Sequence, residues 1–377
     1  MGRSLLALLI FWSGWAHAHG GPPVTHDVLL GSGSVDLVTT HGFFSEDSGW
    51  MWICEEASGA DLAASSVRTP SGWLVGTLAG VQTSEYGCQW MQESTIGERY
   101  IHHLVQDVDN PNHTWAATDE GVWLLDGLDK ATFDIPVDFS LRHLGQREDG
   151  AFILVGFDGP TPIAEIDGTR LELPAKTGRI EVLTSDEQGR FYLRFPAGLT
   201  DRLVRVSETG AEVLIAQTNL IRDVASIGPD LYVLYQDGTS WSFDDGASWT
   251  PRAGEPIRCL VEAPAGFYAC PSQGGGPALF FSPNLDADPS TWTWEIALNF
   301  DEVTVNTCEP GTTAGNQCPY LWRVAGVELG VLEPSSDEEI DSEASSCAGG
   351  KPTNSHPLLL LVLGLLWAGR YKKVQSR

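Results

Sequence analysis

The side chains of this chain that could perform chemistry are its carboxylates, histidines and cysteines, and few of them stand at a spacing that enzymes use. Neither H-E-x-x-H nor G-x-S-x-G occurs, and no glycine-rich phosphate loop is present. The 50 acidic residues make chance pairs certain, so no acid/base dyad can be chosen. His102, His103 and His113 have no cysteine or acidic partner at ligand spacing, and we expect surface or packing roles for them.

Two metal sites can be considered, and neither has the spacing of a known site. Asp286 and Asp288 could hold Ca²⁺, but the frame of a known calcium loop is missing, so we interpret the segment as a turn. His19 could offer an amine and an imidazole to copper if the mature chain begins there. No C-x-x-C pair occurs, and the cysteine spacings suit no zinc site. We therefore expect neither a metal nor a cofactor.

The 7 cysteines indicate disulfides with one residue left over, as is usual in an exported chain. Proximity favours Cys259 with Cys270, Cys308 with Cys318, and Cys54 with Cys88, although other connectivities stay open. Cys347 would then be the unpaired cysteine.

The clearest local pattern is Ser242-Phe243-Asp244-Asp245-Gly246-Ala247-Ser248-Trp249. At this spacing Ser242 and Asp244 can fold back onto the backbone amides of a tight turn. Gly246 supplies the backbone freedom that the turn needs. Trp249, after Ser248, is expected to lead the next strand and to bury its ring beneath the turn.

Two further segments keep parts of this pattern in the same frame. Equivalent positions hold Ser45, Asp47, Gly49 and Trp52 in the first, and Thr83, Glu85, Gly87 and Trp90 in the second. A fourth copy has eroded to Asp126-Gly127-Leu128-Asp129. The pattern resembles the Asp-box, or BNR repeat, of β-propellers such as sialidases and sortilin-like proteins. That resemblance implies a structural brace within a blade, with no chemistry of its own.

Sialidase activity is the enzymatic function that this resemblance suggests. Sialidases grip a carboxylate with three arginines, use a tyrosine nucleophile and carry a Phe-Arg-Ile-Pro motif. The nearest match is Phe133-Asp134-Ile135-Pro136, in which Asp134 replaces the arginine and would repel the substrate. A fold does not carry a function by itself, so we favour a non-catalytic protein. A sialidase-like or other glycan-active hydrolase is the alternative.

Strand-like runs recur along the chain with a period near 40 residues. The second strand of each unit begins near Leu37, Trp73, Thr114, Phe152, Phe191, Leu231 and Phe267, with steps of 36 to 41 residues. With 41 Gly and 22 Pro, this predicts an all-β fold, a seven-bladed β-propeller over residues 26–332, with six or eight blades as alternatives. Two more predicted strands, Val303 to Val305 and Tyr320 to Val324, would close the ring or start an eighth blade.

Both ends of the chain predict export. Residues 1–18 have a basic start, an apolar run and Ala16-His17-Ala18, as in a secretory signal peptide. Residues 333–346 form an acidic tether that cannot bury enough apolar surface to fold. In residues 347–377, Cys347 precedes an apolar run of 12 residues and a basic end.

The run of 12 residues spans roughly 18 Å, well short of a bilayer core of about 30 Å. The segment resembles the MYXO-CTERM class of bacterial sorting tails, which implies that Cys347 is the processing and anchoring point. A simple tail anchor in the membrane is the alternative.

The net charge of the chain excludes polyanions as partners. Without Arg3 and the five basic residues after Cys347, 16 basic residues stand against 50 acidic ones, a net charge of −34. Such a surface repels nucleic acid and anionic lipid.

From the sequence we therefore expect an exported, cell-surface-anchored, non-catalytic propeller, monomeric, that binds an unknown extracellular protein or glycan. Membrane or processing machinery would recognise its tail. Four tryptophans could stack on sugars, but we expect most of them to pack between sheets: Trp73, Trp90, Trp123 and Trp241.

Overall fold

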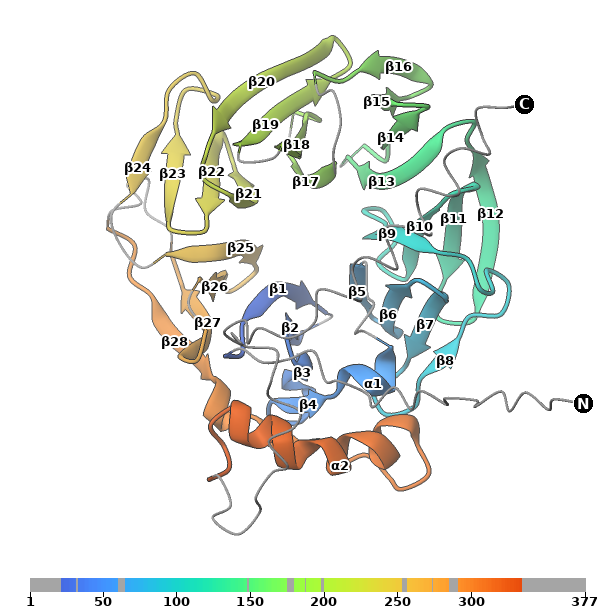
Figure 1. The fold of residues 1–377 in the computed structure, drawn as a ribbon, viewed down its shortest axis with the longest axis vertical. Coiled ribbons are helices and arrows are strands. Elements are labelled where there is room, and N and C mark those ends of the chain that lie inside the picture. The colour runs from blue at the N-terminus through green and yellow to red at the C-terminus, as the bar shows by residue number, and fades with distance from the viewer. Residues whose placement is uncertain are drawn as a thin grey trace, which may run out of the picture. The chain divides into compact units, whose positions relative to one another are not determined.

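Seven sheets stand around one axis in this chain (Figure 1). The computed structural model describes residues 22–333 except 32, 60–64, 148, 175–179, 187, 198–199, 253–255, 273 and 285–290. The predicted signal peptide, His19, Asp286, Asp288 and Cys347 lie outside the described residues, as does the tether beyond Glu333.

Each sheet is a blade made of four consecutive antiparallel strands, so the predicted all-β, seven-bladed propeller is confirmed. Blades 1 to 4 contain β1 (Thr25–Leu30), β2 (Val35–Thr39), β3 (Gly42–Ser45) and β4 (Met51–Ile53); β5 (Ser65–Thr69), β6 (Gly72–Thr77), β7 (Gly80–Ser84) and β8 (Met91–Gln92); β9 (Ile101–Gln106), β10 (His113–Thr118), β11 (Gly121–Asp126) and β12 (Lys130–Pro136); and β13 (Ser140–Gln146), β14 (Phe152–Asp158), β15 (Thr161–Ile166) and β16 (Thr169–Glu172).

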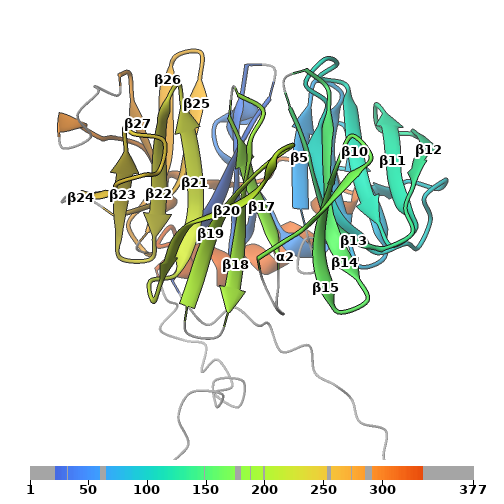
Figure 2. The same cartoon turned by 90° about the horizontal axis from the view of Figure 1, so that it is seen from above.

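Blades 5 to 7 repeat this plan, and Figure 2 shows the ring edge-on, with its strands running across its thickness. They contain β17 (Glu181–Ser185), β18 (Phe191–Ala197), β19 (Thr200–Ser207) and β20 (Gly210–Gln217); β21 (Ile221–Ile227), β22 (Asp230–Tyr235), β23 (Gly238–Ser242) and β24 (Thr250–Arg252); and β25 (Ile257–Ala263), β26 (Gly266–Pro271), β27 (Pro277–Ser282) and β28 (Glu295–Asn299). The first strand of each blade lies innermost (Figure 1).

Four hairpins of blades 1 to 3 use one turn, Thr-x-x-Gly, in which the threonine hydroxyl donates to the glycine carbonyl at 2.9 to 3.1 Å. The pairs are Thr39 and Gly42, Thr69 and Gly72, Thr77 and Gly80, and Thr118 and Gly121. At Gly121 the backbone φ is 141°, and an added Cβ would collide with the carbonyl of Ile135 on β12. Only glycine fits there.

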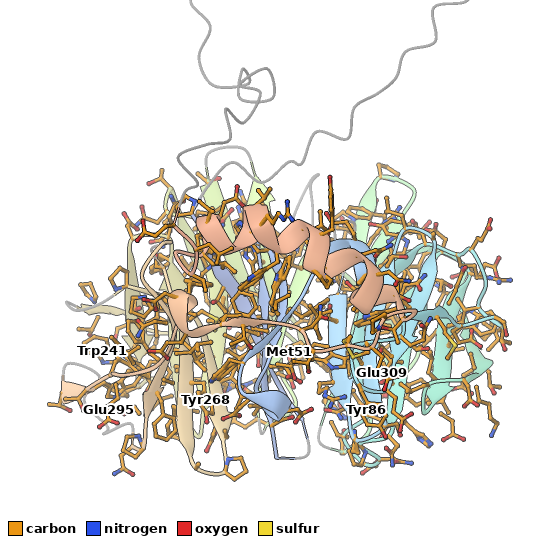
Figure 3. All side chains as sticks on the ribbon, turned by 90° about the horizontal axis from the view of Figure 1, so that it is seen from below. Met51, Tyr86, Trp241, Tyr268, Glu295 and Glu309 are labelled. Carbon is orange, nitrogen blue, oxygen red and sulfur yellow. A yellow bond between two sulfur atoms is a disulfide. The ribbon has the colours of Figure 1, made fainter. Side chains whose placement is uncertain are left out.

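The core lies between neighbouring sheets, where side chains fill the space (Figure 3). Val155 on β14 and Phe191 and Leu193 on β18 are fully buried in one cluster that joins blades 4 and 5. Because each sheet has a neighbour on both sides, its middle strands bury residues of both faces. These strands therefore read as nearly continuous apolar runs.

The chain closes the ring on the outside of blade 1. β29 (Thr304–Val305) pairs in parallel with β4 and becomes its fifth strand. Helix α2 (Thr313–Glu328) follows, and its first turn is capped by Thr312, whose side chain accepts from the Gly315 amide at 3.1 Å. Closure against the N-terminal blade is thus confirmed, and no eighth blade forms among the described residues.

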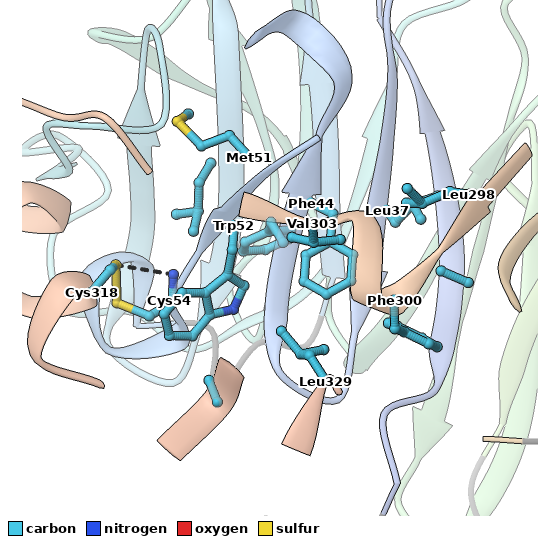
Figure 4. Close-up of a cluster of buried hydrophobic side chains, with 14 of the residues drawn as sticks. Leu37, Phe44, Met51, Trp52, Cys54, Leu298, Phe300, Val303, Cys318 and Leu329 are labelled. Carbon is cyan, nitrogen blue, oxygen red and sulfur yellow. Dashed lines mark hydrogen bonds between the residues drawn. A yellow bond between two sulfur atoms is a disulfide. The ribbon is translucent and has the colours of Figure 1, made fainter. Parts of the chain in front are cut away.

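The predicted strand Tyr320 to Val324 is wrong, because these residues lie inside α2. Buried Ala314, Cys318, Ala325 and Leu329, with partly buried Trp322, follow a helical spacing and face blade 1. The ring of Trp322 lies 5.3 Å from that of Trp52. Figure 4 shows this cluster around Trp52 and Phe300.

Two disulfides attach the C-terminal segment, residues 304–329 with β29 and α2, to the first two blades. Cys54 bonds to Cys318 on α2, and Cys88 bonds to Cys308 before it. The expected pairs Cys54 with Cys88 and Cys308 with Cys318 are therefore wrong, because ring closure places residues 308–318 beside blades 1 and 2. The third predicted pair, Cys259 with Cys270, is confirmed between β25 and β26.

Short helices complete the described part: α1 (Glu55–Ser58), η1 (Glu46–Ser48) and η4 (Phe300–Glu302). Within the described ranges, no helix combines the length and apolar character needed to cross a bilayer.

Candidate ligand-binding site

The inner strand carries an irregularity at the same place in six of the seven blades. One extra residue interrupts its pairing with the second strand, which makes a β-bulge. We call these the bulge residues: His26, His102, Arg142, Leu183, Arg222 and Arg258. In blade 2, β5 pairs with β6 without interruption over its described residues.

A bulge can re-aim one side chain while its neighbours keep their places in the core. Ile221 and Ile257, which precede Arg222 and Arg258, are fully buried, whereas the arginines are only partly buried. Three of the six bulge residues are arginines and two are histidines, in a chain with 22 Lys and Arg, 9 His and 50 Asp and Glu. Composition alone does not produce this concentration of basic side chains.

A cavity of about 510 Å³ lies among the inner strands and is the strongest candidate for a binding site. Its walls come from β1, β9, β17, β21 and β25, and four bulge residues line it: His26, Leu183, Arg222 and Arg258. His26 and its neighbour Asp27 are exposed to solvent, so water reaches the cavity. Its volume falls in the range of small-molecule sites, about 300–1,000 Å³.

The basic side chains of the cavity repel one another. Burial lowers the pKa of Arg258 to about 10, and the charge of Arg222 adds to this effect. His26 reaches solvent, but partial desolvation by the protein around it, followed by the charges of Arg258 and Arg222, lowers its pKa to about 4, so His26 is neutral at pH 7. Arg222 donates to Gln236 Oε1 at 3.2 Å. Neither arginine forms an ion pair with another described residue.

Two carboxylates stand one residue beyond the bulges. Asp27 accepts from the Val28 amide and Asp223 from the Val224 amide, each at 2.8 Å. Asp27 reaches solvent, but the protein around its carboxyl partly desolvates it and raises its pKa to about 6. Burial and the charge of Asp27 raise the pKa of Asp223 to about 7. The charge of Asp27 therefore acts on Asp223, as the charge of Arg222 acts on Arg258, and the cavity holds like-charged neighbours of both signs.

The bulge residues of blades 3 and 4 are used differently. Arg142 Nη1 lies 3.0 Å from His102 Nε2, and His102 Nε2 lies 2.9 Å from Asp119 Oδ1. His103 lines the cavity and contacts His143, with ring centroids 4.9 Å apart. Burial lowers the pKa of His103 to about 4, which leaves this ring neutral at pH 7. The cationic charge available to a ligand is therefore that of Arg222 and Arg258.

This arrangement can bind an anionic group and hydrogen-bond donors beside it. No group of three or more His, Cys, Asp or Glu side chains is placed to hold a metal ion within the described part of the chain. The coupled pair Asp27 and Asp223 is the one feature here that resembles an acid/base pair.

The predicted box at 242–249 forms the expected turn, away from the cavity lining. Ser242 Oγ accepts from the Gly246 amide and donates to Asp244 Oδ1, both at 2.8 Å. Asp244 also accepts from the amide and hydroxyl of Ser248, at 2.8 and 2.5 Å. These bonds, led by the Ser248 hydroxyl, lower the pKa of Asp244 to about 2. Trp249 is only half-buried, against the cluster between blades 5 and 6.

The other two predicted boxes have different contacts. In the first, Asp47 accepts from Arg68 Nη2 at 2.9 Å and so links blades 1 and 2. Ser45 and Trp52 of this box are buried, and the backbone φ of Gly49 is 83°. In the second, the carboxylate of Glu85 forms a hydrogen bond with the Tyr86 hydroxyl. Thr83 Oγ1 donates to the Met91 carbonyl at 3.3 Å. Trp90 Nε1 donates to the Gly87 carbonyl at 2.8 Å.

The four tryptophans considered for sugar stacking are core residues, with exposed fractions of 1 to 8 %. They are Trp73, Trp90, Trp123 and Trp241. Asp134 of the sialidase-like segment lies on β12, the outer strand of blade 3, and does not line the cavity. The sequence predicts surface or packing roles for His102, His103 and His113. His103 lies in the wall of the cavity, and the prediction is therefore incomplete for this residue.

The cavity residues are not among the predicted site residues, although the sequence carries a signal for them. The runs Ile221-Arg222-Asp223-Val224 and Ile257-Arg258-Cys259-Leu260 are inner strands with a basic residue directly after a buried isoleucine. The same order occurs at Ile101-His102 and Leu141-Arg142. A basic residue repeated at one position of the blade period could have indicated the bulges.

Comparison with solved structures finds propellers of low sequence identity. The extracellular domain of the one-component system BT4673 from B. thetaiotaomicron matches with a TM-score of 0.50 and 15% identity, over 68% of this chain and 38% of that chain. PorZ, a surface component of the type-IX secretion system of Porphyromonas gingivalis, matches with a TM-score of 0.47 and 12% identity, over 78% and 40%. YCF48 bound to D1 peptide matches with a TM-score of 0.47 and 11% identity, over 67% and 92%.

This chain therefore spans about two fifths of the length of the first of these proteins, and the likeness is one of fold. No protein-family model matches the chain. No curated protein matches it either. The class that fold and site define is a seven-bladed β-propeller with a polar cavity on its axis.

Proposed function

We propose that this chain is an exported, surface-anchored, non-catalytic β-propeller that binds an extracellular ligand in its central cavity. The observation that carries the proposal is the cavity itself, which five inner strands line and into which three of them bring His26, Asp27, Arg222, Asp223 and Arg258. Convergent polar groups in a preformed hollow are what small-ligand sites share. A rigid ring keeps them in place without a bound partner.

Export is supported by independent features of the chain. Three disulfides join its described cysteines, which is typical of oxidising compartments. The predicted signal peptide and the acidic exterior agree with a secreted protein. We also propose the Asp-box as the architectural element of blade 6, with reduced copies in blades 1 and 2.

Anchoring is proposed to pass through Cys347. The mature surface form should end near Cys347, and Cys347→Ala should release or mislocalise the protein while its melting temperature stays unchanged. Mass spectrometry of the surface fraction measures the end of the chain. A surface form that retains Arg377, together with correct placement of the Cys347→Ala protein, would favour a simple tail anchor.

The binding proposal is tested by screening the purified mature protein against glycans and extracellular proteins, with the same ligands incubated for product analysis. We expect a ligand that raises the melting temperature, that competes for the cavity and that is recovered intact. If a variant at Arg258 and a variant at an outer-strand residue bind the ligand with equal affinity, the ligand binds outside the cavity.

One observation favours a glycan-active hydrolase as the second candidate. Asp27 and Asp223 interact electrostatically in the cavity, and both pKa values are raised, as in acid/base pairs of glycosidases. Product release that disappears in Asp27→Asn and Asp223→Asn, but not in Asp134→Asn, would support hydrolysis and contradict the non-catalytic function.

A further inference from the structure

We propose that the cavity recognises a carboxylate carried on a hydroxyl-rich ligand, the chemistry of a uronic acid, and that Arg222 and Arg258 hold the carboxylate. The inference rests on the proposed function, because it names the ligand class of the same cavity. It begins from the bulges, which give two neighbouring inner strands an arginine at the same position.

These two arginines differ from most others in the described part of the chain. Ion pairs neutralise eight arginines: Arg68, Arg99, Arg142, Arg147, Arg170, Arg190, Arg194 and Arg205. Arg222 and Arg258 form no such pair with a described residue, although acidic residues outnumber basic ones in this chain. The charge of Arg222 disfavours the charged form of Arg258, and a bound anion would offset this repulsion.

The acidic side chains of the same cavity limit which class of anion can bind there. Asp27, Asp223 and Glu262 line the same cavity as the arginines, and the two aspartates come from strands that also supply a basic bulge residue. Acidic side chains in the wall disfavour a dianionic phosphate more than a singly charged carboxylate, and a single carboxylate matches the planar fork of a guanidinium. Aspartate oxygens accept hydrogen bonds, so ligand hydroxyls next to the carboxylate would be satisfied.

Thr184 and Ser226 add further polar groups to the wall. The ligand is expected to be short, because the exterior of the protein is strongly acidic and repels a long polyanion. The apolar part of the wall, which includes Val182, Leu183 and Val261, can cover the face of a sugar ring. A monomeric or short oligomeric acidic sugar fits these conditions together.

The test is calorimetric titration of the mature protein at pH 7 and low salt with galacturonic acid and its trimer. The probes for comparison are the neutral methyl ester of galacturonic acid, galactose and inorganic phosphate. Arg222→Gln and Arg258→Gln remove one charge each, and Arg323→Gln on the exposed face of α2 is the matched control. Melting curves report folding, and both cavity variants should melt at or above the temperature of the unaltered protein because they remove a repelling charge.

We expect galacturonic acid to bind at least ten-fold more tightly than its methyl ester, and each cavity variant to lose at least ten-fold in affinity. Arg323→Gln should bind as the unaltered protein does. Tighter binding of the trimer than of the monomer would indicate a glycan chain end, and equal binding would indicate a free sugar acid.

Equal affinity for the acid and the ester, or unchanged affinity in Arg222→Gln and Arg258→Gln, would overturn the inference. Phosphate that displaces the acid at lower concentration, or the absence of binding by either acid, would do the same. A neutral glycan bound by both variants would leave the binding function standing without the carboxylate site. Cleavage of the trimer would instead contradict the non-catalytic function and leave the carboxylate site in place.

Discussion

A bulge changes what a single residue can do in the inner strand of a blade. At Ile221-Arg222-Asp223 the isoleucine stays in the core, the arginine reaches the cavity, and the aspartate is fixed by the Val224 amide. The protein thereby holds a cation and an acid side by side on one strand. The cost of this arrangement is electrostatic, since burial disfavours both charges.

That cost makes the stability of the fold depend on pH at Asp223. Its pKa in the folded state is raised to about 7, above the ordinary value of 3.8, by burial and by Asp27. A carboxyl with a raised pKa contributes stability that is fully present below pH 3.8 and is lost as the pH rises through 7. Above that pH the ionised group destabilises the fold.

We therefore expect Asp223→Asn to raise the free energy of unfolding at pH 8 by about 1 kcal/mol, since water in the cavity reduces the effect of burial. The melting temperature should rise by about 2–4 °C. The difference should shrink as the pH falls toward 4, where the native carboxyl is protonated. Asp134→Asn, on the exposed face of β12, is the control and should show no such trend. A difference of the same size at pH 4 and pH 8 would contradict a raised pKa.

At the scale of the element, the strands and turns follow from local sequence more closely than any other feature. Gly121 must be glycine because its φ is positive and a side chain would strike β12. The turn at Ser242 follows from short side chains that can accept from nearby amides. The bulges could not be predicted with the same ease, because a bulge depends on pairing with the next strand and leaves the apolar periodicity nearly unchanged.

The turn of blade 6 offers a test of this local control. Ser242 is buried, accepts from the Gly246 amide and orients Asp244. Ser242→Ala leaves that amide without its partner and should lower the free energy of unfolding by about 1–2 kcal/mol. Ser45→Ala, at the equivalent position of the first box, removes a different bond, that of Ser45 to Asp36, and leaves the turn of blade 6 intact. Chemical denaturation measures both variants, and an unchanged midpoint for Ser242→Ala would show that the turn does not depend on the hydroxyl.

At the scale of the whole molecule, ring closure is the feature that sequence proximity predicted poorly. Cys308 and Cys318 are neighbours in sequence, yet each bonds to a blade more than 200 residues away, with separations of 220 and 264. The sequence predicts a strand where α2 forms, because Tyr320, Trp322 and Val324 favour strands when considered alone. Its buried face becomes visible only when blade 1 is in place to cover it. The blade period could be predicted, whereas what joins the last blade to the first could not.

The two disulfides that attach the C-terminal segment should therefore stabilise the ring more than the local one does. A cross-link that closes a long loop restricts the unfolded chain more than a short one, and typical contributions are about 2–4 kcal/mol. Cys259 and Cys270 are only 11 residues apart, so Cys259→Ala with Cys270→Ala should cost the least. Cys54→Ala with Cys318→Ala should cost more, and removal of both long-range links should cost the most.

Each link has the other as a partial substitute, because Cys88 and Cys308 still hold the segment when Cys54 and Cys318 are replaced. Loss of both should free α2, whose remaining contacts include the hydrogen bond between His41 Nε2 and Glu328 Oε2 at 2.9 Å. Limited proteolysis should then cut first near residues 306–333, before any blade is cleaved. Thermal unfolding and mass spectrometry of the fragments measure these two effects. All three pairs of substitutions could destabilise the protein equally, or the first cleavage could fall inside blade 4. Either result would mean that the inner strands close the ring without help from the disulfide-linked segment.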